Sequence, residues 1–205
     1  MRDFAFDPAF RGQPMIDYFL TALGAAPATV PSAMRRNTWL APRITPTGPP
    51  ATAPAGHILV CPDTASDLRS MPPEVHSRIL ARLAVESTEP VLTQSGMKRA
   101  ETLAELCGLV AGARLVISAD TAMVHLADAF DIPTLAFFTT HRPEWRVRDY
   151  PLCTPIHLPP AGLPEALEFI RTPADIAACR AAWFARGADL AWLDPLIAGA
   201  VGRAR

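Results

Sequence analysis

The chain has 205 residues, 50% of them hydrophobic, and a net charge of −1 from 19 basic and 20 acidic side chains. This length fits one domain with at most a small appendage. Because the charges balance and are scattered, the sequence has no cluster of basic residues of the kind that binds nucleic acid or an anionic membrane. Binding to nucleic acid is therefore disfavoured.

The first residues and the cysteines point to the cell interior. The chain begins Met-Arg-Asp-Phe-Ala-Phe-Asp, with acidic residues where a secretory signal needs an apolar run. No stretch approaches the roughly 18 apolar residues of a membrane span. Cys61, Cys107, Cys153 and Cys179 form no C-x-x-C pair, so neither a zinc knuckle nor a redox dithiol is indicated. We expect a cytoplasmic protein with reduced, mostly buried thiols.

Residues 1–56 form the first predicted region, an N-terminal helix and a proline-rich linker. Apolar residues recur at helical spacing over residues 13–24 and stop at Gly24, which predicts a short amphipathic helix. From residue 26 to 56 prolines recur too often for a regular helix or a central strand. We expect an extended linker in which Trp39 and Leu40 anchor the chain to the body.

Residues 57–205 form the second predicted region, an α/β domain. Short apolar runs alternate with helical patterns, which is typical of a Rossmann-like parallel sheet covered by helices on both faces. The expected strands, about five, are 57–61, 90–93, 114–118, 133–138 and 155–158, and the expected helices are 73–85, 98–110, 121–130, 164–171, 174–185 and 190–201.

Ligands of such sheets bind where strand-to-helix loops converge at the carboxyl ends of the strands. The first of these loops, residues 62–71, is about ten residues long, whereas such connections commonly take two to six. Thr64 and Ser66 could donate to phosphate oxygens there, and Arg69 could neutralise them. The alternative is a solvated loop in which Ser70 caps the helix that follows.

The second loop, residues 118–125, reads Ser-Ala-Asp-Thr-Ala-Met-Val-His and passes at once from a strand into a helix. Asp120 or Thr121 would occupy the N-cap, and Thr121 and His125, four residues apart, share one helical face. The alternative reading makes Asp120 a simple cap and His125 a half-buried, hydrogen-bonded histidine.

The third loop, residues 139–146, is polar and contains an arginine, a histidine and a tryptophan that could bind an anionic or ring-bearing ligand. The alternative is that these are ordinary surface residues. The sequence contains no G-x-S-x-G, P-loop, G-x-G-x-x-G or H-E-x-x-H motif. Cys61 ends a buried strand without any cue for activation, so we expect it to be structural.

The sequence around the second loop resembles the donor-binding, C-terminal half of the heptosyltransferase-like GT-B glycosyltransferases (glycosyltransferase family 9). The hallmark of that family is an aspartate, a serine or threonine, a glycine, two variable residues and a histidine between a strand and a helix. Asp120, Thr121 and His125 match it, with Ala122 in the place of the glycine. The resemblance extends over roughly residues 57–160 and includes Arg69 as the basic residue of a phosphate loop.

This resemblance implies a site for a nucleotide-activated sugar, with no other cofactor and no metal. Asp120, Thr121 and Ala122 would meet the diphosphate or sugar, while Thr64, Ser66 and Arg69 would hold phosphate and His125 would support the loop or contact the ligand. The implied reaction is inverting transfer of a hexosyl or heptosyl group, with the base supplied by an acceptor-binding domain.

The sequence also departs from the family pattern. Thr139 and Thr140 replace a glycine and a proline, and relative to the family one strand–helix unit is missing between Val85 and Leu106. Residues 1–56 are too short and too rich in proline to form the acceptor-binding domain. Two readings stay open: a donor-binding subunit that acts with a separate acceptor domain or as a homodimer, and a non-catalytic domain that serves protein interaction or regulation.

Overall fold

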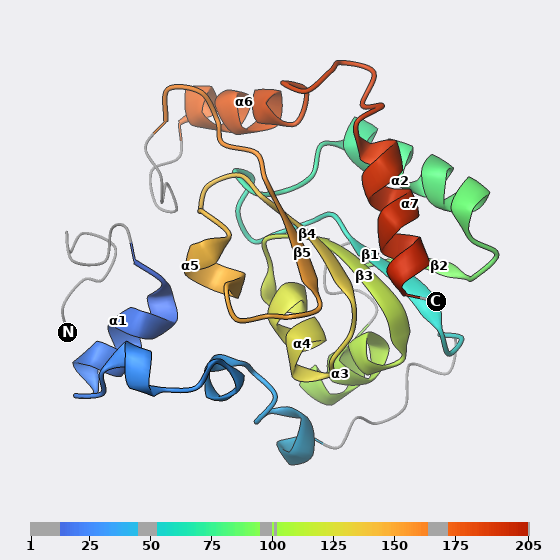
Figure 1. Cartoon of the computed structure of the whole chain (residues 1–205). Coiled ribbons are helices and arrows are strands. Elements are labelled where there is room, and N and C mark those ends of the chain that lie inside the picture. Colours follow the sequence, from blue (N-terminus) through green and yellow to red (C-terminus); the bar gives the residue numbers. More distant parts are fainter. Residues whose placement is uncertain (1–12, 45–52, 95–99, 101, 164–171, 205) are drawn as a thin grey trace.

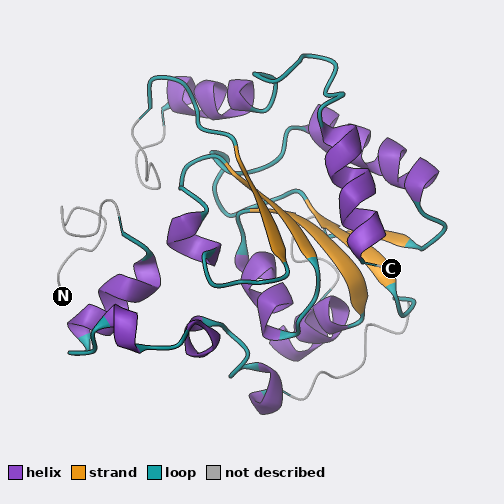
Figure 2. Cartoon of the chain, viewed as in Figure 1, coloured by secondary structure: helices purple, strands orange, loops and turns teal. Residues whose placement is uncertain are grey.

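The computed structural model describes residues 13–44, 53–94, 100, 102–163 and 172–204. Figures 1 and 2 show a central sheet flanked by helices, with the N-terminal segment lying along one side. The strands and longer helices, in chain order, are α1 Met15–Ala22, β1 His57–Cys61, α2 Pro73–Glu86, β2 Val91–Thr93, α3 Leu103–Ala111, β3 Ala113–Ala119, α4 Ala122–Ala129, β4 Thr134–Phe138, α5 Glu144–Val147, β5 Cys153–His157, α6 Pro173–Ala182 and α7 Leu193–Arg203.

The five strands form one parallel sheet in the order β2-β1-β3-β4-β5, which confirms the predicted Rossmann-like α/β class and the half-GT-B architecture. The chain moves from β1 to β2 on one side and then crosses to β3 on the other. The direction of winding therefore reverses between β1 and β3. The register pairs Cys61 with Ser118, so the loops that leave these two strands begin side by side.

Helices cover both faces of the sheet, as the uninterrupted apolar strands predict. On β1, Ile58 and Val60 point to the face that α2 and α7 cover. Leu59 and Cys61 point to the opposite face, in a cluster with residues of α3 and α4. The alternation of side chains along one strand thus feeds two separate cores.

The C-terminal segments complete one of these cores within the chain. Trp183 is fully buried, with its ring centroid 5.2 Å from that of Phe137, and α7 packs against α2. The sequence leaves open whether the C-terminal helices, with Trp183, Phe184 and Trp192, pack back on the body or on a partner. Trp183 covers the sheet of its own chain, whereas Phe19 of α1 is 42% exposed.

The N-terminal segment is tied to α4 by charged contacts. Arg36 binds Asp128 through Nε at 2.9 Å and Asp131 through Nη2 at 2.6 Å. The backbone N–H of Asn37 donates to Asp128 Oδ2 at 2.9 Å. The predicted linker is therefore anchored mainly by these polar contacts.

Of the two expected apolar anchors, only Leu40 packs against the core cluster. Trp39 is 55% exposed, with the guanidinium of Arg43 5.4 Å from its ring centroid, so its predicted anchoring is wrong. The guanidinium of Arg43 covers one face of the Trp39 ring, so this ring does not have to be buried in the core.

Element boundaries differ most where local capping decides them. A capping box formed by Thr102 and Glu105 starts α3 at Leu103, later than the predicted residue 98. The predicted helix 164–171 lies outside the described residues, as do 95–99 and 101. The short helix α5 was not predicted and begins inside the third candidate loop.

We expect Leu193→Ala to destabilise the protein far more than Leu103→Ala. Leu193 is 0% exposed in the core between α2 and the sheet, and its truncation should lower the free energy of unfolding by about 2–5 kcal/mol. Leu103 is 59% exposed, so the same change there should cost about 0.5 kcal/mol or less. Urea unfolding followed by circular dichroism measures both, and equal losses would contradict this placement of α7.

Candidate functional site

Three loops meet around one carboxylate at the carboxyl edge of the sheet. Asp120 follows β3, Arg69 lies in the loop after β1, and His141 lies in the loop after β4. Asp120 Oδ2 is 3.5 Å from Arg69 Nη1 and 3.6 Å from His141 Nδ1. Thr139 Oγ1 also donates to the carbonyl oxygen of Leu68 at 2.8 Å, which joins the first loop to the third. The convergence predicted for these loops is present.

Asp120 is buried, with 3% of its surface exposed, yet its pKa lies below the ordinary value for an aspartate. Burial by itself would raise the pKa of Asp120, but the hydrogen bond from His141 and the charges of Arg146 and Arg69 lower it below the ordinary value. Arg146 reaches the same group indirectly, since its Nη2 lies 3.3 Å from His141 Nε2. Two guanidinium groups therefore contribute to the low pKa of a single carboxylate.

Thr121 starts α4. Its hydroxyl accepts a hydrogen bond from the backbone N–H of Met123 at 3.1 Å and lies 3.2 Å from Ser118 Oγ. Thr121 is therefore the N-cap, one of the two positions considered, while Asp120 bonds across to the other loops. Ala122, the first residue of the helix, is exposed. The amino end of α4 and its positive dipole thus open at the same edge of the sheet.

The β1 loop is organised largely by its own hydroxyl groups. Thr64 Oγ1 donates to the carbonyl oxygen of Ser66 at 2.5 Å and accepts from its N–H at 2.9 Å. Ser70 Oγ accepts from the N–H of Thr64 at 3.0 Å, and α2 starts after Pro72 with no side-chain cap, so the capping role considered for Ser70 is wrong. Of the three phosphate candidates in this loop, Arg69 is the one whose bonds reach Asp120.

His125 lies one turn into α4, and its side chain contacts Tyr150, which follows α5. Its Nδ1 is 2.7 Å from the hydroxyl of Tyr150, which also receives a hydrogen bond from the side-chain amide of Asn37. Burial lowers the pKa of His125, against the opposing charge of Asp120. This is the half-buried, hydrogen-bonded histidine of the alternative reading, but it also lines a cavity.

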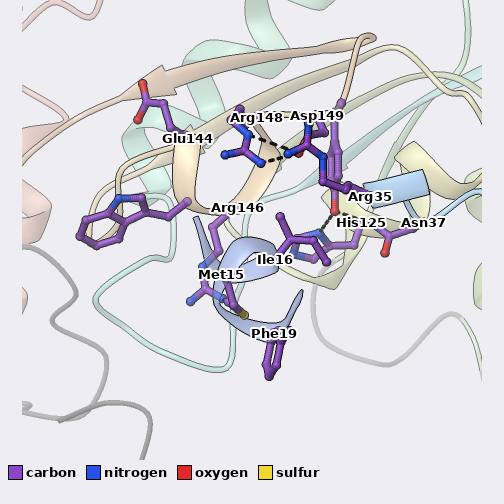
Figure 3. Close-up of a pocket in the computed structure, with 12 residues that line it drawn as sticks. Met15, Ile16, Phe19, Arg35, Asn37, His125, Glu144, Arg146, Arg148 and Asp149 are labelled. Atoms are coloured by element: carbon purple, nitrogen blue, oxygen red, sulfur yellow. Dashed lines mark hydrogen bonds and ion pairs between the residues drawn. The ribbon is translucent and has the colours of Figure 1, made fainter. Parts of the chain in front are cut away.

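That cavity has a volume of about 300 Å³ and lies between the N-terminal segment and the region from α4 to α5. Met15, Ile16 and Phe19 of α1 line it together with His125, Arg146 and Arg148 (Figure 3). Arg146 borders this cavity and also lowers the pKa of Asp120. The cavity therefore adjoins the convergence point of the loops.

Sequence reasoning found part of this constellation. The third loop was a candidate as a whole, and the structure singles out His141 and Arg146 within it. Asn37 and Tyr150 were missed, because nothing in their local sequence distinguishes them from ordinary surface residues. Only the fold brings Asn37 from the linker to α4.

Within the described residues, no three His, Cys, Asp or Glu side chains are grouped so that they could hold a metal ion. None of the helices in the same residues has both the length and the apolar character that crossing a bilayer demands.

Part of the chain matches a known protein family. Residues 78–151 match the family model described as glycosyltransferase family 9 (heptosyltransferase). The chain resembles the heptosyltransferases. The match contains the hallmark Asp120-Thr121 and His125, as the sequence resemblance predicts, whereas β1 and Arg69 lie before its first residue.

One solved structure agrees in fold with a TM-score above 0.5. The dodecameric, iron-containing glycosyltransferase TibC from enterotoxigenic Escherichia coli has 15% identity and a TM-score of 0.51, over 77% of this chain and 48% of its own. The heptosyltransferase WaaC of E. coli, solved with ADP, has 20% identity and a TM-score of 0.47, over 69% of this chain and 48% of its own. The chain thus spans about half the length of these structures. A search of curated protein sequences finds no match.

We expect Asp120→Asn to lower the free energy of unfolding by about 1.5–3 kcal/mol at pH 7, because the charge-assisted bonds to Arg69 and His141 are lost. A carboxyl whose pKa is lowered by folding stabilises the protein above its unfolded pKa of about 3.9, and this contribution disappears as the pH falls through the lower folded value.

The difference between wild type and variant should therefore shrink as the pH falls below about 4. Urea unfolding across a pH series measures it. Asp67→Asn, at an exposed position of the β1 loop, is the matched control and should change stability by no more than about 0.5 kcal/mol. A pH-independent difference for Asp120→Asn would contradict the ionised state assigned to it.

Proposed function

We propose that this chain is a nucleotide-sugar donor-binding domain of the heptosyltransferase type. The observation that carries the proposal is the position of the hallmark residues. Asp120, Thr121 and His125 lie at the end of β3 and the start of α4, beside the β1 loop, where the winding of the sheet reverses. In open α/β sheets this is the place where nucleotides bind.

The geometry assigns different tasks to the charged groups. The diphosphate would lie at the amino end of α4, where the positive end of the helix dipole and the Thr121 hydroxyl can meet it. Arg69 and Arg146 would neutralise its charge, which removes the need for a metal ion. Asp120 repels phosphate, so it would hold Arg69 and His141 in place and could accept from a sugar hydroxyl.

Transfer would proceed by direct displacement with inversion: the acceptor oxygen bonds to the anomeric carbon while the bond from that carbon to the diphosphate breaks, and the nucleoside diphosphate leaves. The acceptor hydroxyl needs a general base, which in this proposal a separate acceptor-binding domain or a second copy of the chain supplies. WaaC and TibC are about twice as long as the portions that align with this chain, which supports a division of labour between two such units.

A second function is supported by the surface of the N-terminal segment. Large apolar side chains are exposed along it, namely Phe19, Leu23, Met34 and Trp39. Exposed apolar groups clustered on one segment favour contact with another protein. A non-catalytic interaction or regulatory module would use this surface without binding nucleotides.

Titration of the purified chain with ADP, UDP, GDP and their sugars by calorimetry separates the two functions. We expect one of these nucleotides to bind, and Arg69→Ala to weaken binding by about 1.5–3 kcal/mol if it makes a charge-assisted phosphate contact. Arg82→Ala, on α2 and paired with Glu86, is the control and should bind normally. If none of the nucleotides binds at millimolar concentration, the donor-binding function is refuted.

Ala122→Gly tests the departure from the hallmark. The methyl group of Ala122 is exposed at the first position of α4, where a phosphate would approach the backbone. Its removal should tighten nucleotide binding, while the free energy of unfolding should fall by no more than about 1 kcal/mol because glycine is a poor helix former. Weaker binding by the glycine variant would show that the methyl group is no obstacle.

A further inference from the structure

A chain of hydrogen bonds links the N-terminal segment to the hallmark histidine. The side-chain amide nitrogen of Asn37 donates to the hydroxyl oxygen of Tyr150, and that hydroxyl lies 2.7 Å from His125 Nδ1. The rings of His125 and Tyr150 meet edge to face, with centroids 5.7 Å apart. Asn37 and His125 line the same cavity (Figure 3). Asn37 lies before residues 78–151, the region that matches the family.

The direction of these bonds fixes a proton. A phenol carries one hydrogen, and burial raises the pKa of Tyr150, so the hydroxyl keeps that hydrogen. Because Asn37 donates to the oxygen, the hydroxyl hydrogen is left to donate to His125. Nδ1 must then be the acceptor nitrogen of a neutral imidazole, and the ring proton sits on Nε2.

Nε2 is the ring nitrogen that remains for a ligand. His125 lines the cavity between α1 and α5, and no residue in the described part of the chain bonds to Nε2. A neutral imidazole with its proton on Nε2 can donate to an oxygen in that cavity, but it cannot take a proton there. His125 in this tautomer is a donor to the ligand and is unsuited to act as the base.

We propose that Asn37 and Tyr150 are positioning residues that hold His125 as the Nε2–H tautomer, so that it donates to an oxygen of the bound nucleotide sugar. The tautomer is a property of the free chain, whereas the contact with the sugar nucleotide rests on the proposed function. The N-terminal segment thereby takes part in the site through Asn37.

The charges around His125 favour its neutral form on balance. Asp120, at the end of β3, and Asp128, at the far end of α4, favour protonation, while Arg146 of α5 opposes it together with burial. Tyr150 contributes its neutral hydroxyl. These groups set the pH at which the tautomer would be lost, which lies below the value of about 6.5 typical of an exposed histidine.

The tautomer can be read directly from the nitrogen resonances of the full chain labelled with ¹⁵N-histidine, with His125→Gln used to assign the signal. We expect one neutral form with the proton on Nε2 at pH 7.5, and less protonation at pH 6.5 than an exposed histidine shows. A proton on Nδ1 would mean that the bonds run from His125 through Tyr150 to the amide oxygen of Asn37, and would overturn the proposal.

Variants test the positioning role. Tyr150→Phe removes the donor to Nδ1 and should give a mixture of tautomers, whereas Tyr18→Phe makes the same chemical change on α1 and should give none. Asn37→Asp places an acceptor beside the phenol and should draw its hydrogen away, which moves the histidine proton to Nδ1. In Asn37→Asp combined with Tyr150→Phe this effect should vanish. An unchanged tautomer in Tyr150→Phe and Asn37→Asp would overturn the proposal.

ADP titration of the same samples tests the ligand contact. Binding should shift the Nε2 resonance of His125, and Tyr150→Phe should weaken binding about fivefold, the value of one neutral hydrogen bond. Binding without any change at Nε2 would refute the donor role and leave the proposed function standing. The absence of binding by every nucleotide tested would refute the proposed function and the donor role together, while the tautomer would stand or fall on the spectra of the free chain.

Discussion

A buried carboxylate must find hydrogen-bond donors, because an ionised group left unpaired in a protein interior costs several kcal/mol. Asp120 meets this requirement with groups from two other loops, Arg69 after β1 and His141 after β4. The three loops therefore adopt their positions together. The carboxyl edge of the sheet becomes a fixed constellation in which the amino end of α4 and two guanidinium groups face the same region.

The other end of α4 is held by the same kind of interaction. Asp128 is buried and binds Arg36 and the backbone of Asn37, both from the N-terminal segment. The helix is thus fixed at its start by the loop cluster and near its end by the linker. His125 lies between the two acids, so its ring is positioned by both halves of the chain.

Periodicity and turn chemistry predicted the sheet well, since each strand is an apolar run closed by polar or proline residues. The carboxyl ends of parallel strands must meet at one edge, so the cluster around Asp120 could also be foreseen. The partners of Asp120 could not be chosen from sequence, because Arg69, Arg142 and Arg146 look alike before the loops fold. Trp39 and Trp183 illustrate the same limit: both are apolar, yet one stays exposed and one is buried, according to the surface that each segment reaches.

Some residues around the candidate site lie inside the region that matches the family, and others lie before it. The match covers residues 78–151, which include the end of β3, the start of α4 with His125, the third loop and Tyr150. Arg69, Asn37 and the apolar wall from α1 lie before it. These residues contact the matched part from outside the strands of the sheet. In the proposed function, the matched residues would fix where the nucleotide sugar binds, and the residues before the match would form the rest of its surroundings.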